Sequence, residues 1–118
     1  MIIKPEALHY SEKIIKRLEE NDINILETID IAPSIDMVME HYREYRERDF
    51  FYDLCHYIAN SEVKVIVVDI SPRRGRRMLL ELRKEFGIDS KRNGIHASYS
   101  EEEFYREYSI WFKHYYFS

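Results

Sequence analysis

The histidine at position 96 has neighbours suited to phosphate chemistry. Residues 91–98 read K-R-N-G-I-H-A-S, so His96 lies in a short apolar segment between Asn93 and Ser98. A neutral imidazole can attack phosphorus through one ring nitrogen while a hydrogen bond to the other nitrogen fixes the tautomer. A lone histidine on such a strand is often only structural, but these polar neighbours favour a role in accepting and returning a phosphate.

The rest of the chain predicts the elements that must position His96. Alternating and β-branched residues indicate strands, and apolar residues at helical spacing indicate helices between them. We expect strands over 1–4, 23–31, 63–68 and 94–97, and helices over 9–20, from 34 through at least 41, over 49–59, over 72–86 and from 100 onwards. Ser34, Asp49 and Ser100 are expected N-caps. Ile23, Ile25, Ile29 and Ile31 are expected on one face of their strand.

This order, βαββαβ with extra helices between the second and third strands, predicts an α/β (α+β) ferredoxin-like sandwich. Helices would pack on a four-stranded antiparallel sheet. The fold hosts many unrelated functions, so the site must decide the function.

Composition predicts one small domain over residues 1–118. The chain is 45% hydrophobic, enough for one core, and it carries a single cysteine, Cys55. A lone cysteine cannot form an internal disulfide and fits a reducing, cytoplasmic location, where Cys55 is a small buried residue. No apolar run has membrane-spanning length, and no secretory signal precedes Lys4. A net charge of −4 disfavours binding to nucleic acid.

Short motifs accompany the His96 segment along nearly the whole chain. They are I-K-P-E at 3–6, H-Y at 41–42, F-F-Y-D-L at 50–54, G-R-R-M-L at 75–79, R-K-E-F at 83–86, R-N-G-I-H-A-S at 92–98 and E-Y-S-I-W-F at 107–112. In this order they resemble the signature of the nucleoside diphosphate kinases. The resemblance implies transfer of the terminal phosphate of a nucleoside triphosphate to a nucleoside diphosphate, by a ping-pong mechanism through a phosphohistidine.

The resemblance also assigns catalytic roles. His96 matches the nucleophile, Glu107 the carboxylate that orients it, and Ser98 a third member of that group. Lys4 matches the phosphate-binding lysine, with Tyr42 beside it.

Arg76 and Arg83 match two phosphate-binding arginines, whose planar groups suit paired contacts with oxygen atoms. Spacing alone leaves open whether Arg76 or Arg77 points inward, and a solvated helix face is the alternative for both. The motif register favours Arg76.

The nucleoside would lie on Phe50, which stacks on the base, with Leu54 lining the same cleft. Stacking does not read base edges, so we expect low base specificity. Asn93 and Lys4 would bind the ribose hydroxyls. Mg²⁺ bridging the phosphates is implied as the cofactor and needs few protein ligands. The other histidines show no metal-ligand spacing: His9, His41, His56 and His114. The residue at the His41 position is structural in the resembling family.

Departures from the family pattern concern the first strand, the nucleoside cleft and one loop. The first strand is clipped, Glu6 replaces an aspartate, Ser90 replaces an apolar residue that faces the base, and Lys91 replaces a glycine. Three residues between Leu79 and Arg83 replace a long loop that carries a phosphate-contacting threonine and packs at the threefold axis of hexamers. Its loss disfavours a hexamer and favours a homodimer through residues 23–31.

Two other classes of function stay open. The first is a catalytically weak or silent domain of the same fold that binds nucleotides or a protein. The second is a nucleic-acid-binding module that uses the basic residues 73–77 and exposed tyrosines, against which the net acidity counts.

Overall fold

The computed structural model describes residues 1–90 and 92–117, with side chains described through Lys113 except at position 91. Its centre is a four-stranded sheet in the order β2-β3-β1-β4, with every pair antiparallel. The strands are β1 (Ile2–Ile3), β2 (Asn24–Ile31), β3 (Val63–Asp69) and β4 (Ile95–His96). This topology confirms the expected ferredoxin-like fold, and it pairs β1 with β4 from opposite parts of the chain.

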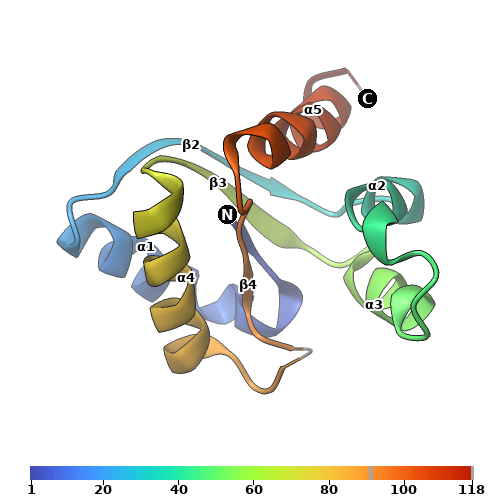
Figure 1. Cartoon of the computed structure of the whole chain (residues 1–118), viewed down its shortest axis with the longest axis horizontal. Helices are drawn as coiled ribbons and strands as arrows, with labels where there is room; N and C mark the ends of the chain where they lie inside the picture. The colour runs from blue at the N-terminus through green and yellow to red at the C-terminus, as the bar shows by residue number, and fades with distance from the viewer. Residues whose placement is uncertain (91, 118) are drawn as a thin grey trace.

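Helices cover both faces of the sheet (Figure 1). They are η1 (Pro5–Tyr10), α1 (Ser11–Glu20), α2 (Ile35–His41), η2 (Arg43–Tyr45), α3 (Phe51–Ile58), α4 (Pro72–Phe86) and α5 (Glu101–Phe117). One buried cluster joins α1 and α4 to the sheet, and a second joins α2, α3 and α5 to the opposite face. His96 ends its short strand between these two layers.

Side-chain caps fix where several helices begin. The Ser34 hydroxyl accepts from the Met37 amide at 3.3 Å, and the Ser100 hydroxyl accepts from the Glu103 amide at 3.1 Å, as predicted. The predicted Asp49 cap is wrong. Helix α3 begins at Phe51, and Phe50 holds the N-cap position without a side-chain hydrogen bond.

The prediction that the four isoleucines of the segment 23–31 share one face is also wrong. Ile25 pairs with Val68 and Glu27 with Val67, so one extra residue bulges at position 26. Because a single added residue reverses the side-chain alternation, Ile25 packs with the α1–α4 cluster, whereas Ile29 and Ile31 pack with the opposite one.

Helix α4 runs without interruption through residues 79–83, where relatives were expected to carry a long loop. Leu79 and Leu82 are buried on its inner face, so the three residues between Leu79 and Arg83 simply continue the helix. Cys55 is buried and free, as expected. Among the described residues, no helix has the length and apolar character to cross a membrane.

Candidate active site

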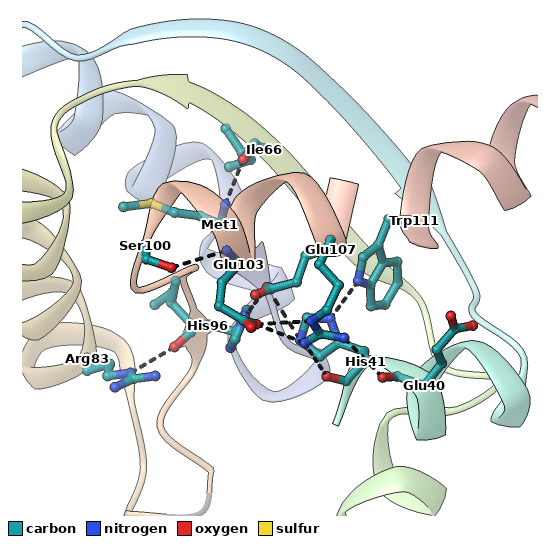
Figure 2. Close-up of polar contacts among 12 residues, drawn as sticks. Met1, Glu40, His41, Ile66, Arg83, His96, Ser100, Glu103, Glu107 and Trp111 are labelled. Carbon is teal, nitrogen blue, oxygen red and sulfur yellow. Dashed lines mark hydrogen bonds and ion pairs between the residues drawn. The ribbon is translucent and has the colours of Figure 1, made fainter. Parts of the chain in front are cut away.

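His96 projects from the end of β4 toward α5, where it meets Glu107 (Figure 2). Its Nε2 lies 2.5 Å from the Glu107 Oε1, and the Glu107 residue is only 7% exposed. Since that contact occupies Nε2, Nδ1 is the ring nitrogen left for a ligand. His96 also lines the large cleft described below. The structure therefore pairs the predicted nucleophile with its predicted carboxylate.

Burial sets the protonation state of this ring. Desolvation lowers the pKa of His96 to about 3, and nearby positive charges, including those of Lys4 and Arg83, act in the same direction. The ring is therefore neutral near pH 7, and a neutral ring with its proton held on Nε2 presents a lone pair on Nδ1. That is the form a nucleophilic imidazole needs.

Polar groups around Glu107 hold the carboxylate in place. Burial raises the pKa of Glu107, while a hydrogen bond from the Ser98 side chain and the positive charge of Arg106 oppose that rise. Ser98 thus lies beside the carboxylate, and it is not among the described residues that line the large cleft in front of His96. Glu103 fixes Arg106 through a contact of 3.0 Å.

A cleft of about 930 Å³ opens in front of His96. Its lining contains most of the predicted ligand-binding residues: Lys4, Tyr42, Phe50, Leu54, Arg83 and Asn93. The volume lies in the range typical of small-molecule sites, and cations and aromatic rings share its walls. The arrangement suits a ligand with an anionic end and a planar end.

Lys4 and Arg83 supply the positive charge beside His96. Lys4 is only 5% exposed, its Nζ donates to Asn93 Oδ1 at 2.7 Å, and burial lowers its pKa to about 8. Arg83 donates from Nε to the Ile95 carbonyl at 2.8 Å, which leaves its two terminal nitrogens for other acceptors. Burial lowers the pKa of Arg83 too, but an arginine stays charged.

Aromatic residues form the other end of the cleft. Phe50 is 38% exposed, and the centroid of its ring lies 5.6 Å from that of Tyr45. The Tyr45 centroid lies 6.2 Å from that of Tyr42. Tyr42 is buried, and desolvation raises its pKa well above the ordinary value. An accessible Phe50 face next to Leu54 suits stacking by a planar base.

Arg76 is the predicted site residue that the structure places apart from the rest. It is exposed on α4, seven residues before Arg83, and it does not belong to the described lining of the cleft. Its charge still contributes to lowering the pKa of Arg83, because two residues seven positions apart lie on the same side of the helix.

Sequence reasoning missed several residues here. Glu6 accepts from the Gly94 amide at 2.9 Å and from the Tyr57 hydroxyl at 2.8 Å, so the residue noted only as a departure anchors the His96 segment. Tyr45 and Asp53 also line the cleft. The position of Tyr45 three residues after Tyr42 could have indicated a shared face, whereas the Glu6 contacts join positions too distant for a spacing rule.

The structure also brings His41 against the site. One possible ligand atom from each of His41, His96 and Glu107 lies within 4.8 Å of the other two, a donor set that sequence spacing did not indicate. The His41 Nδ1, however, accepts a hydrogen bond from the Trp111 indole at 2.9 Å. The neutral ring therefore carries its proton on Nε2, which opposes metal binding through that atom.

Comparisons with known proteins identify the family of this chain. A model of the family described as "Nucleoside diphosphate kinase" matches residues 1–72. The nucleoside diphosphate kinase of Methanothermobacter thermautotrophicus is 32% identical over 95% of this chain and 84% of its own length. The cytosolic nucleoside diphosphate kinase of Dictyostelium discoideum is 30% identical over 96% and 82%.

A solved structure gives the same result. The crystal structure of a nucleoside diphosphate kinase family protein from Babesia bovis superposes with a TM-score of 0.84, at 27% identity over 97% of this chain and 86% of that one. These matches identify a phosphotransferase with the ferredoxin-like fold. The chain belongs to the nucleoside diphosphate kinase family.

Proposed function

We propose that the chain is an active nucleoside diphosphate kinase that works through a phosphohistidine at His96. In the first half-reaction, Nδ1 of His96 bonds to the terminal phosphorus of a nucleoside triphosphate. The bridging P–O bond breaks, and the diphosphate leaves with the electron pair. A terminal oxygen of a second diphosphate then bonds to the same phosphorus, the P–N bond breaks, and its electron pair returns to Nδ1, which restores the neutral imidazole. The observation that carries this proposal is the His96 Nε2–Glu107 contact at the wall of a cleft that places Lys4 and Arg83 beside His96.

Glu107 and Ser98 serve the nucleophile in this proposal. As Nδ1 gains its phosphate, the ring acquires positive charge, and the Glu107 carboxylate beside the Nε2–H stabilises that charge. Ser98 holds the carboxylate.

Lys4 and Arg83 face the phosphates, where transfer depends mainly on positioning and charge. Arg76 joins them only if its exposed side chain turns toward bound phosphate. Tyr42 lies beside this group in the cleft wall.

The nucleoside would occupy the aromatic end of the cleft. Phe50 and Leu54 flank the base, and Asn93, already bonded to Lys4, would contact the ribose hydroxyls. Three aspartates line the cleft, but among the described residues they do not form a metal-binding cluster, which fits a Mg²⁺ ion that arrives on the nucleotide: Asp49, Asp53 and Asp89. Bound there, Mg²⁺ would neutralise phosphate charge.

The test is steady-state phosphotransfer with the donor triphosphate and acceptor diphosphate varied together. A phosphoenzyme that forms before the acceptor binds predicts parallel lines in double-reciprocal plots, and ATP alone should release one equivalent of ADP in a burst. Intersecting lines without a burst would indicate direct transfer between two bound nucleotides and would contradict this mechanism.

A catalytically silent nucleotide-binding domain is the second candidate function. The observation that favours it is the uninterrupted helix through residues 79–83, because the loop threonine of the family has no counterpart there. The burst and turnover assays distinguish the two functions: a silent domain would bind ADP with its Mg²⁺, as measured by calorimetry, but give neither the ADP burst nor turnover.

We also propose that residues 1–118 form one domain that assembles as a homodimer in the cytoplasm. Strand β2 is an edge strand of eight residues, which supports pairing with its copy across a twofold axis. The continuous α4 disfavours the hexamer. The free, buried Cys55 supports a reducing compartment. Light scattering over a concentration series tests the assembly, and a stable mass of six chains would contradict it.

A further inference from the structure

His41 carries an unpartnered polar atom inside the site. The residue closes α2 and is only 2% exposed. Its Nδ1 accepts from the Trp111 indole N–H at 2.9 Å, whereas its buried Nε2 has no hydrogen-bond partner among the described residues. Figure 2 shows this ring between Trp111 and Glu107. A buried polar group without a partner is uncommon in a folded protein, so it calls for an explanation.

Trp111 determines which nitrogen of His41 carries the proton. An indole N–H can only donate, so His41 Nδ1 must present its lone pair to it. Burial lowers the pKa of His41 to about 3, so the ring is neutral near pH 7. The single proton of the ring therefore lies on Nε2.

That proton faces the carboxylate that orients the nucleophile. His41 Nε2 lies 3.7 Å from Glu107 Oε1, the same oxygen that contacts His96. A movement of less than about 1 Å would bring the pair within hydrogen-bond range. The His41 and His96 rings also touch edge to face, with centroids 4.5 Å apart.

We propose that His41 is a positioning residue for phosphotransfer, with its Nε2–H set by Trp111 and aimed at Glu107 so that the carboxylate stays ionised and turned toward His96. The two N–H groups then converge on one oxygen, and rotation of the carboxylate away from His96 would leave the His41 proton facing no acceptor. This role rests on the proposed function, because it acts through the phosphorylated ring.

The backbone around His41 is anchored for such a role. Arg106, one residue before Glu107 on α5, donates to the His41 carbonyl at 3.0 Å and to the Glu40 carbonyl at 3.2 Å. These bonds cap the C-terminal end of α2 and tie it to the helix that carries the carboxylate. The distance between His41 and Glu107 is therefore set by direct contacts between α2 and α5.

The wild-type protein already tests the proposal. ¹⁵N NMR of histidine-labelled protein near pH 7 should show His41 protonated on Nε2, and His96 likewise. A His41 ring protonated on Nδ1 would overturn the proposal, because Nε2 would then repel the Glu107 oxygen. This measurement needs no activity, so it stands even if no phosphoenzyme forms and the proposed function fails.

Two amide variants separate positioning from structure. His41→Gln places an N–H near the Nε2 position and loses the Trp111 acceptor, whereas His41→Asn can accept from Trp111 but does not reach Glu107. We expect kcat of His41→Asn to fall roughly 10- to 100-fold while KM stays within about twofold. His41→Gln should recover most of that loss, and His96 should lose tautomer purity only in the Asn variant.

His56 on α3 is exposed and provides matched controls, because His56→Gln and His56→Asn should behave as wild type. Rates are expressed per folded molecule. A merely structural His41 would leave kcat per folded molecule equal in the two variants, with His96 unchanged in both. That result, or an Asn variant more active than the Gln variant, would overturn the proposal.

Discussion

His96 separates two regions that are built in different ways. In front of it, the cleft leaves Phe50 38% exposed and offers cations and aromatic faces to a ligand. Behind it, Glu107, His41 and Trp111 are at most 7% exposed and contact one another in fixed pairs. The open side can accept varied nucleosides, whereas the closed side determines the protonation and direction of a single ring. We expect changes in front to alter binding and changes behind to alter chemistry.

The largest expected effect comes from the ring that both regions share. His96→Ala should reduce turnover to background, a loss of at least about 10⁴-fold, because no other described group in the cleft wall replaces the nucleophile. Nucleotide binding should persist, as seen by calorimetry. Measurable ping-pong turnover in this variant would show that the two regions serve some other residue. His56→Ala is the exposed control.

Loss of the buried cation should come next. Lys4→Met removes the charge beside His96, and we expect kcat to fall about 10²- to 10³-fold, as for loss of one preorganised donor at a developing charge. Lys16→Met, on the exposed face of α1, is the control. If Lys4→Met raised only KM, Lys4 would bind the substrate and the transition state equally well. The cleft would then contribute to binding but not to the rate of phosphate transfer.

The same lysine predicts a pH dependence. Burial lowers the pKa of Lys4 to about 8, so its charged form is present below that pH and is lost as the pH rises through it. The kcat/KM of the wild type, which reports groups of the free enzyme, should fall about tenfold per pH unit above pH 8. Lys4→Met should lose this limb. If kcat/KM of the wild type stayed constant up to pH 9.5, the positive charge that activity requires would not be that of Lys4.

A smaller effect is expected at the aromatic end of the cleft. Phe50→Ala should weaken nucleotide binding about 5- to 150-fold with little change in kcat, since stacking on one base contributes about 1–3 kcal/mol. Tyr52→Ala, which is exposed beside the cleft, is the control. Purine and pyrimidine diphosphates should be used within about one order of magnitude of each other. A larger preference would indicate base-edge contacts from Asp53, Asp89 or Ser90, which also line the cleft.

The smallest expected effect concerns the segment between α4 and β4, which bounds the cleft. A Cβ at Gly87 would lie 2.6 Å from the Arg83 carbonyl oxygen and 2.7 Å from that of Asn93, so Gly87→Ala should destabilise the fold by about 1–3 kcal/mol. Gly75→Ala meets only an ordinary 3.5 Å contact within a helix, and it should be neutral or stabilising. Thermal unfolding measures both, and equal melting temperatures would contradict this account of the segment.

The fold and most residues of the site could be predicted from the sequence, because periodicity and motif register depend on residues that are close together along the chain. The caps at Ser34 and Ser100, the continuous β3 and the pairing of His96 with Glu107 followed from that information. The isoleucines of β2 were misplaced because a bulge depends on pairing with β3, which one strand's pattern does not encode.

The contacts of the site that could not be predicted join residues far apart in the sequence. The contacts of Glu6 with Gly94 and of His41 with Trp111 join residues 88 and 70 positions apart, and only the sheet order brings them together. The sequence also did not predict that Arg76 is exposed. A motif gives the position of a residue along the helix, but the direction of its side chain relative to the cleft depends on how the helix packs.

The most direct test of the account is the site of phosphorylation after incubation with labelled ATP and Mg²⁺. We predict one acid-labile, base-stable phosphate per chain, on Nδ1 of His96, that transfers to added nucleoside diphosphate. Mass spectrometry of the modified peptide and ³¹P NMR identify the residue and the nitrogen. Label that persists in His96→Ala, label on Nε2, or a phosphohistidine that no diphosphate discharges would contradict it.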